Sequence, residues 1–410
     1  MKKSISILLI LLVLILGACQ AIPTALTQIA PTNAVELMAL PTATADLTEK
    51  ATTAGSTATA SEKVEILYAK NFTIKYKEGY KLLSVQTKDS LSAVEYALVP
   101  KGTNPTIDEQ DAVIIQTPIE KIITLSSTYY TMLEQINELD TVVGIDDATY
   151  TFNNTIQKAV QDGKIAIVGG DGAGALLSLE KVMELAPDVL MSPYMNAQIF
   201  EDAKLKESTD SLVLNADYLE NSPLGRAEWG KFVAAFYDKE VEAGKLFDQM
   251  VARYEEAKSL AAGVSEKPSV FVNTAYQGSW YMPGKESYVA ELLKDAGANY
   301  LFADSVEGTG ASPLAFEVVY EKAKDADYWL NIGFSSDIAG LVAEDARYSE
   351  FKAVIEGKVY NNNARMNANG GTDFYEGGVA NPDIVLRDLV KIFYPDLLPD
   401  YQLFYYTEVN

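Results

Sequence analysis

The side chains that could carry chemistry in this chain are tyrosine, tryptophan, serine and carboxylates, because histidine is absent and Cys19 is the single cysteine. A Ser-His-Asp triad, a Cys-His pair and an internal disulfide are therefore excluded, as is any zinc or haem site built on imidazole or several thiolates. With 57 acidic residues, a carboxylate pair could be imagined anywhere and does not by itself indicate glycoside chemistry. The composition favours binding by aromatic faces and neutral polar groups.

Candidate binding residues gather in loops that follow predicted strands, the edge where open α/β sheets bind ligands. Aromatic side chains beside a few polar groups suit a cleft for a bulky organic ligand. The alternative is that each aromatic simply caps a core, and for the Tyr276–Tyr281 loop the two interpretations stay open. The candidates are Ser127, Thr128, Tyr129, Tyr194, Tyr276, Trp280, Tyr281, Phe334, Arg365 and Phe374.

Short apolar strands alternate with helical segments in two blocks, which predicts parallel βαβ units covered on both faces. The predicted fold class is α/β, with two Rossmann-like lobes of parallel sheet joined by one long helix and a small N-terminal β appendage. The expected strands are 121–125, 142–145, 165–168, 189–191 and 212–214 in the first block, and 269–274, 300–303, 328–332 and 359–361 in the second.

A helical stripe of apolar side chains runs from Ala227 to Ala262 and predicts one helix of about 35 residues, roughly 50 Å long, that braces the two lobes. A coiled-coil seam is the alternative, but the spacing follows 3.6 residues rather than a strict heptad. The expected domains are a signal peptide (1–18), a tether (19–61), a β appendage with antiparallel strands (62–118), an N-terminal lobe (119–226), the linking helix (227–262) and a C-terminal lobe (263–410).

The N-terminus is typical of a secretory signal, with Lys2 and Lys3 before the apolar run Ile5–Leu16. The following Leu16-Gly17-Ala18-Cys19 resembles the bacterial lipobox, which implies cleavage before Cys19 and lipid on its sulfur; a plain signal peptide is the alternative. The Ala/Thr/Pro-rich tract to about Ser61 is too polar to bury a core and is interpreted as a flexible tether. The net charge of −24 disfavours nucleic acid as a partner.

Several segments resemble the substrate-binding proteins of bacterial ATP-binding-cassette (ABC) importers for iron–siderophores, haem and vitamin B12. The resemblance covers about Lys121 to Phe393 and is carried by the following motifs. They are Lys121–Ser126, Val142–Ile145, Leu179-Glu180-Lys181-Val182 running into Ala186–Leu190, Pro283–Ser287, Leu292–Ala298 and Asp327–Leu330.

The resemblance implies a non-enzymatic, monomeric protein, held outside the cytoplasm by its lipid, that captures an iron–siderophore, corrinoid or haem-like ligand between two lobes. If the envelope has two membranes, the protein faces the periplasm. It also implies a partner, the permease dimer with its ATPase, onto which Glu180 and Glu317 would dock, with Glu321 as the fallback in the second lobe. No cofactor or bound metal is expected, since the related metal-ion binders use histidine. A lipid-anchored surface enzyme, for example a carbohydrate hydrolase, and a ligand sensor without transport are the alternatives.

The charge of the candidate loops narrows the ligand class. Arg365 is their single evident cation, whereas five acids lie nearby in the sequence: Asp146, Asp147, Asp171, Asp373 and Glu376. A highly anionic ferric catecholate would need several Arg or Lys donors to offset the desolvation of its oxygens. The sequence therefore predicts a neutral or cationic ligand, such as a hydroxamate-type complex or a corrinoid.

Overall fold

The computed structural model describes residues 63–86, 93–169, 177–193, 205 and 211–410. The predicted signal peptide, Cys19, the tether and Tyr194 lie outside these residues. Among the described residues, no helix combines the length and the apolar character needed to cross a membrane.

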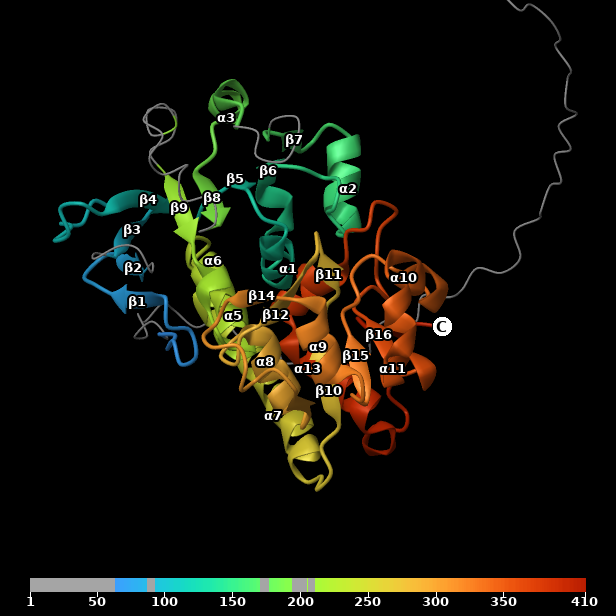
Figure 1. Cartoon of the computed structure of the whole chain (residues 1–410). Helices are drawn as coiled ribbons and strands as arrows, with labels where there is room; N and C mark the ends of the chain where they lie inside the picture. The colour runs from blue at the N-terminus through green and yellow to red at the C-terminus, as the bar shows by residue number, and fades with distance from the viewer. Residues whose placement is uncertain (1–62, 87–92, 170–176, 194–204, 206–210) are drawn as a thin grey trace, which may run out of the picture. The chain divides into compact units, whose positions relative to one another are not determined.

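The first lobe is built on a five-stranded parallel sheet whose strand order is β7-β6-β5-β8-β9 (Figure 1). Its strands are β5 (Ile122–Thr124), β6 (Val142–Ile145), β7 (Ala166–Ile167), β8 (Val189–Pro193) and β9 (Leu212–Asn215). Helices α1 (Thr128–Gln135), α2 (Asn154–Gln161) and α3 (Leu179–Leu185) connect them. All residues of β5 and β9 are buried, as expected for strands covered on both faces.

The second lobe has its own five-stranded sheet, in the order β13-β10-β15-β16-β17, which is parallel except for the last strand. Its strands are β10 (Ser269–Val272), β13 (Asn299–Tyr300), β15 (Tyr328–Leu330), β16 (Val359–Asn361) and β17 (Thr407–Glu408). Helices α8 (Tyr288–Asp295), α9 (Phe316–Ala323), α10 (Ile338–Glu344) and α11 (Lys352–Ile355) belong to this lobe. The predicted class, two lobes of largely parallel sheet, is confirmed.

A small antiparallel sheet in the second lobe was not predicted. It pairs β12 (Ser279–Pro283) with both β11 (Ala275–Tyr276) and β14 (Ala311–Leu314). The Tyr276–Tyr281 segment, expected as a loop, is therefore a hairpin whose turn contains Gly278 at φ 80°. The alternating orientation of strand side chains then decides which of its aromatics face the core.

The linking helix is shorter than predicted over 227–262, because the chain is broken into separate helices within that range. Helix α6 (Trp229–Ala235) ends before a break, and α7 (Glu240–Ala262) follows with 23 residues, a length of about 35 Å. Asp238 adopts a left-handed conformation at φ 57° and bonds through its carboxylate to Lys81 at 2.7 Å. The buried rings of Phe236 and Tyr237 hold the break in the core of the first lobe.

Helix α7 nevertheless connects the two cores, as the brace interpretation expected (Figure 1, yellow). Ala243 near its start belongs to the first-lobe core, whereas Phe247 and Tyr254 belong to the second. It packs along α13 (Pro382–Phe393), which follows the short helix α12 (Gly377–Ala380).

The N-terminal sheet has four strands in the order β1-β2-β3-β4: β1 (Phe72–Tyr76), β2 (Lys81–Val85), β3 (Val94–Pro100) and β4 (Val113–Thr117). The first three are antiparallel, as predicted, but β4 runs parallel to β3. The sheet shares the first-lobe core, since the Phe72 ring lies 4.6 Å from that of Trp229. The predicted N-terminal β sheet is therefore present, and it packs on the first lobe.

Candidate functional site

Two segments that follow strands of different lobes meet directly, and we call them the interlobe seam. In the first lobe it comprises residues 147–153, which follow β6, and in the second lobe residues 365–376, which follow β16. Asn367 donates a side-chain hydrogen bond to the carbonyl of Thr151 at 2.8 Å, and Asn369 donates one to Thr149 at 3.1 Å. Both lobes therefore contribute to one site at the edge where their strands end.

Gly371 marks the closest approach of the two lobes. A Cβ built on this residue would lie 1.8 Å from the backbone oxygen of Tyr150, far inside van der Waals contact. Its neighbour Gly370 has φ 90° and lies against the ring of Phe334. The Gly370-Gly371 pair thus allows a backbone contact between the lobes that any side chain would prevent.

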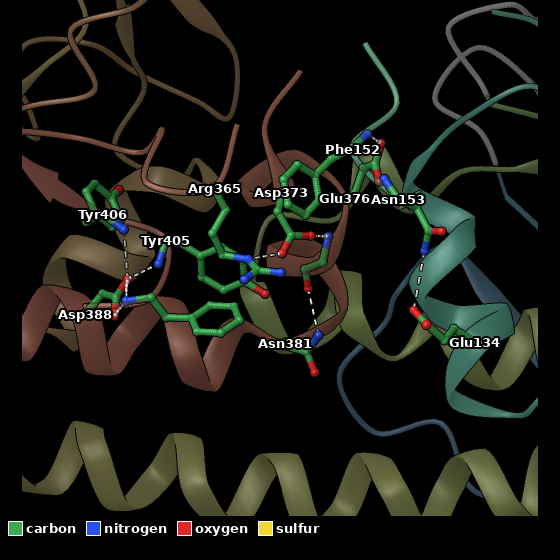
Figure 2. Close-up of polar contacts among 12 residues, drawn as sticks. Glu134, Phe152, Asn153, Arg365, Asp373, Glu376, Asn381, Asp388, Tyr405 and Tyr406 are labelled. Atoms are coloured by element: carbon green, nitrogen blue, oxygen red, sulfur yellow. Dashed lines mark hydrogen bonds and ion pairs between the residues drawn. The ribbon is translucent and has the colours of Figure 1, made fainter. Parts of the chain in front are cut away.

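Glu376 is a buried acid of the seam, with 2% of its surface exposed. Figure 2 shows its carboxylate beside Phe152 and Asn153, whose backbone N–H groups donate to Oε1 and Oε2 at 2.6 and 3.0 Å. Burial raises the pKa of Glu376 to about 7, although the hydrogen bonds from Phe152, Asn153 and Ser127 act in the opposite direction. Sequence reasoning treated Glu376 as a nearby acid and missed its role in the seam, for which the sequence carries no signal.

Arg365 is a seam residue, but its charge is already paired. Its Nε donates to Asp373 at 2.6 Å, and its guanidinium lies 5.1 Å from the ring centre of Phe152 and 4.4 Å from that of Phe404. Asp373 in turn accepts the N–H of Gly377 at 3.1 Å. The predicted cation of the site is therefore held between two rings and neutralised by a carboxylate.

The predicted first-lobe residues divide between surface and core. Ser127 and Thr128 open α1 and are partly exposed, and the Thr128 hydroxyl shares a 2.9 Å hydrogen bond with Ser126. Tyr129 is fully buried, and burial raises its pKa well above the usual value. Its hydroxyl has no hydrogen-bond partner among the described residues. The assignment of Tyr129 as a ligand-facing side chain is corrected, because α1 turns its ring into the first-lobe core.

In the second lobe, strand alternation separates the three predicted hairpin aromatics. Trp280 is fully buried, donates from Nε1 to the carbonyl of Val272 at 2.9 Å and packs 5.6 Å from Trp329. It is a core residue, and its assignment to the ligand site is corrected. Tyr276 and Tyr281 point the other way, and 65% and 46% of their surfaces are exposed.

Of the two predicted phenylalanines, Phe334 is exposed and Phe374 is partly buried. Phe334 is 86% exposed and lies beside Gly370 of the seam. Phe374 is half-buried and packs edge-on against Tyr405 and Tyr406, so its ring belongs mainly to the second-lobe core. Two exposed seam tyrosines were missed, namely Tyr150 at 63% and Tyr375 at 60% exposure. We call Tyr150, Tyr276, Tyr281, Phe334 and Tyr375 the exposed aromatic set.

The two predicted docking glutamates lie on helices outside the seam. Glu180 is exposed in the first turn of α3, whose N-cap Ser178 accepts the N–H of Lys181 at 3.4 Å. Glu317 is exposed in the first turn of α9 and lies 3.3 Å from Arg347. Arg347 pairs more closely with Asp345 at 2.6 Å and stacks on the Phe316 ring. Glu321, the fallback, is exposed and paired with Lys324.

The seam offers carboxylates but no clustered ligand set. Among the described residues, no group of three or more Cys, Asp or Glu side chains is arranged to hold a metal ion. The arrangement supplies aromatic faces, amide groups and a buried acid, which together can bind an organic ligand by stacking and hydrogen bonding.

The sequence of this chain matches one protein-family model and several known proteins. A sequence model of the family described as periplasmic binding protein matches residues 122–365. An uncharacterized lipoprotein of Methanocaldococcus jannaschii is 30% identical over 308 residues, which span 72% of this chain and 70% of the relative. An uncharacterized ABC transporter substrate-binding lipoprotein of Bacillus subtilis is 24% identical over 71% of this chain and 86% of its own length.

The fold is also found among solved structures. A possible iron-binding, periplasmic solute-binding protein of Staphylococcus epidermidis superposes with a TM-score of 0.51 at 17% identity. The superposition covers 68% of this chain and all of that protein.

Proposed function

Because this chain belongs to the periplasmic binding protein family, we propose that it is the solute-binding component of an ABC importer. It is a binding protein and not an enzyme. The observation that carries the proposal is the family match over residues 122–365, which runs from the first strand of one lobe to Arg365 in the seam of the other. A site shared by two lobes can enclose a ligand and present it to a partner.

We propose an iron–siderophore or a corrinoid as the ligand. The exposed aromatic set provides faces for a bulky organic complex, and a protein with the same fold is described as possibly iron-binding. The charge at the seam supports a neutral or cationic ligand, because Arg365 is paired with Asp373 while Glu376 is buried nearby. A multiply charged anion would lose its water without gaining a cationic partner there.

We further propose that Cys19 carries lipid and that residues 19–61 tether the folded part to the outer face of the cell membrane. The description of two relatives as lipoproteins supports this. Glu180 and Glu317 are proposed to dock onto a permease dimer, since each is an exposed carboxylate on a different lobe.

Native mass spectrometry of the full chain as isolated tests the ligand assignment. The protein is then mixed with a neutral ferric hydroxamate, a cobalamin, haem and a ferric catecholate, and each complex is read as an intact mass. We expect the hydroxamate or the cobalamin to bind more tightly than the catecholate. Tighter binding of the catecholate would contradict the charge argument, and conversion of any ligand to a product would contradict the binding-protein assignment.

The exposed aromatic set supplies a matched pair of variants for the same measurement. Phe334→Ala removes an exposed ring beside Gly370, whereas Val318→Ala removes an exposed apolar side chain on α9, away from the seam. We expect the first variant to weaken ligand binding and the second to leave it unchanged. Equal binding by both variants would remove Phe334 from the site.

A further inference from the structure

Glu376 ends the segment 365–376 that comes from the second lobe, and it is bonded to the first lobe. The helix that follows it, α12, packs in the first-lobe core through Val379 and Ala380. Glu376 lies between the short helical turn Asp373–Tyr375 and α12. Its two oxygens accept N–H groups from Phe152 and Asn153, immediately before α2. Asn153 is itself the N-cap of α2, since its side chain accepts the N–H groups of Thr155 and Ile156. Glu376 thus fastens the start of α2 to the segment that runs from the second lobe into α12.

Among the described residues, the groups around Glu376 leave its charge without a cationic partner. Its hydrogen-bond donors are the backbone N–H groups of Phe152 and Asn153 and the Ser127 side chain, and the nearby Arg365 is committed to Asp373. Asp373 acts on Glu376 as a like charge. The titratable and charged groups facing this region are Tyr130 and Glu134 from α1, Asp146 and Asp147 from the loop after β6, Tyr405 from the C-terminal segment, and Arg365 and Asp373 from the seam.

We propose that Glu376 is the positioning residue of the binding site, and that the protonation of its carboxyl group sets how firmly the two lobes hold together. The inference rests on the proposed function in one respect, namely that the lobes must part to admit a ligand. Gly371 supports it independently, because its contact with the Tyr150 backbone exists only while the same two segments are together.

The direction of the pH effect follows from burial. In the closed seam the pKa of Glu376 is raised to about 7, whereas a carboxyl released into water returns to its ordinary value of 4.5. The closed form therefore binds the proton more tightly than the open form. Acidification from pH 8 towards pH 5 stabilises closure, and closure weakens as the pH rises through 7. The ratio of closed to open molecules changes by up to about tenfold per pH unit between the two pKa values.

Spin-label distance measurement on the ligand-free full chain tests this inference. In a Cys19→Ala background, labels are attached at Lys158→Cys on α2 and Ile355→Cys on α11, two exposed positions in different lobes. We expect the distance distribution to shift to shorter values between pH 8.5 and pH 5.5. A distribution that is identical at both pH values would overturn the proposal.

Three variants test whether the pH response of the distance distribution comes from Glu376. Glu376→Gln keeps an acceptor for Phe152 without a titrating group, so its distribution should not change with pH. Glu376→Ala should give the longer distances at both pH values. Glu134→Gln, a nearby exposed acid, should titrate like the parent; a pH response that survives in Glu376→Gln would refute the role of Glu376.

A second substitution separates the two seam segments and leaves the Glu376 carboxyl group unchanged. If Glu376→Ala does not fold, as judged by circular dichroism, Gly371→Ala takes its place, since its Cβ must push away the Tyr150 backbone. We expect the longer distances at both pH values; a closed distribution would overturn the proposal. The spin-label experiment uses the ligand-free chain. If none of the tested ligands binds, the proposed function is contradicted, but the distance measurement still tests the role of Glu376.

Discussion

The carboxylate of Glu228, which is fully buried at the start of α6, accepts the backbone N–H of Tyr68 at 2.7 Å. The same carboxylate accepts N–H groups from Leu67 and Ala69 and pairs with the buried Lys231 at 2.8 Å. Residues 67–69, which lead into the N-terminal sheet, are thus fixed to the start of α6, the helix that precedes α7. Within a few residues of Lys63, where the described residues begin, the chain is already part of the folded core.

Replacing Glu228 with Ala should destabilise the protein by about 3–5 kcal/mol, because Lys231 and three backbone N–H groups would lose their buried partner. Urea unfolding followed by circular dichroism measures the change in free energy of unfolding. Glu321→Ala, which removes an exposed acid on α9, is the control and should change it by less than about 0.5 kcal/mol. A similar small effect for Glu228→Ala would contradict the anchoring role.

Trp280 and Tyr281 are adjacent but should respond differently to substitution. Trp280→Ala should cost about 3–5 kcal/mol of stability, since it empties part of the second-lobe core. Tyr281→Ala should leave stability within about 0.5 kcal/mol and weaken ligand binding, because this ring is exposed. Thermal unfolding and intact-mass titration of both variants separate the two roles. Unchanged ligand binding by a folded Tyr281→Ala protein would exclude this ring from the site.

The double variant Glu180→Ala, Glu317→Ala should abolish transport while ligand binding and folding stay nearly unchanged. The reason is that both carboxylates are exposed outside the seam and are proposed to pair with cationic residues of the permease. Uptake of labelled ligand by cells and association with the permease in detergent are the measurements.

The alternative is that the two acids only complement helix dipoles, worth about 0.3–1 kcal/mol each. In that case uptake would persist and the melting temperature would fall slightly. Glu317 is already close to Arg347, so Arg347→Ala should leave transport intact if docking frees this carboxylate from its neighbour. Normal uptake by the double variant would contradict the docking role of Glu180 and Glu317, and Glu321 would be tested next.

Cys19→Ala should release the protein from membranes and leave the precursor uncut at the lipobox. The physical reason is that an acyl chain supplies the membrane affinity, which the polar, acidic body does not. Fractionation and mass spectrometry of the N-terminus provide the measurement. Processed mutant protein that still sediments with membranes would contradict lipid attachment at Cys19.

The sequence alone determined the layers of the fold. Runs such as Ile122–Thr124 and Leu212–Asn215 are buried along their whole length, so their apolar character predicted strands of a covered parallel sheet. Some helix starts also carry a local signal in the sequence, as at Ser178, whose side chain accepts the N–H of Lys181. These features depend on residues close together in the chain.

Tertiary structure decided the rest, because burial and pairing depend on what the rest of the chain places opposite each residue. The apolar stripe of 227–262 does not reveal that Lys81, far away in the sequence, binds Asp238 where α6 and α7 separate. For the Tyr276–Tyr281 segment the sequence leaves a binding surface and a core cap both open, and only pairing with β14 directs Trp280 inward and Tyr281 outward. Glu376 was one acid among 57 until folding buried it against the amides of Phe152 and Asn153. A carboxyl group acquires a raised pKa only when its water is removed, and the chain segments that remove it come from both lobes.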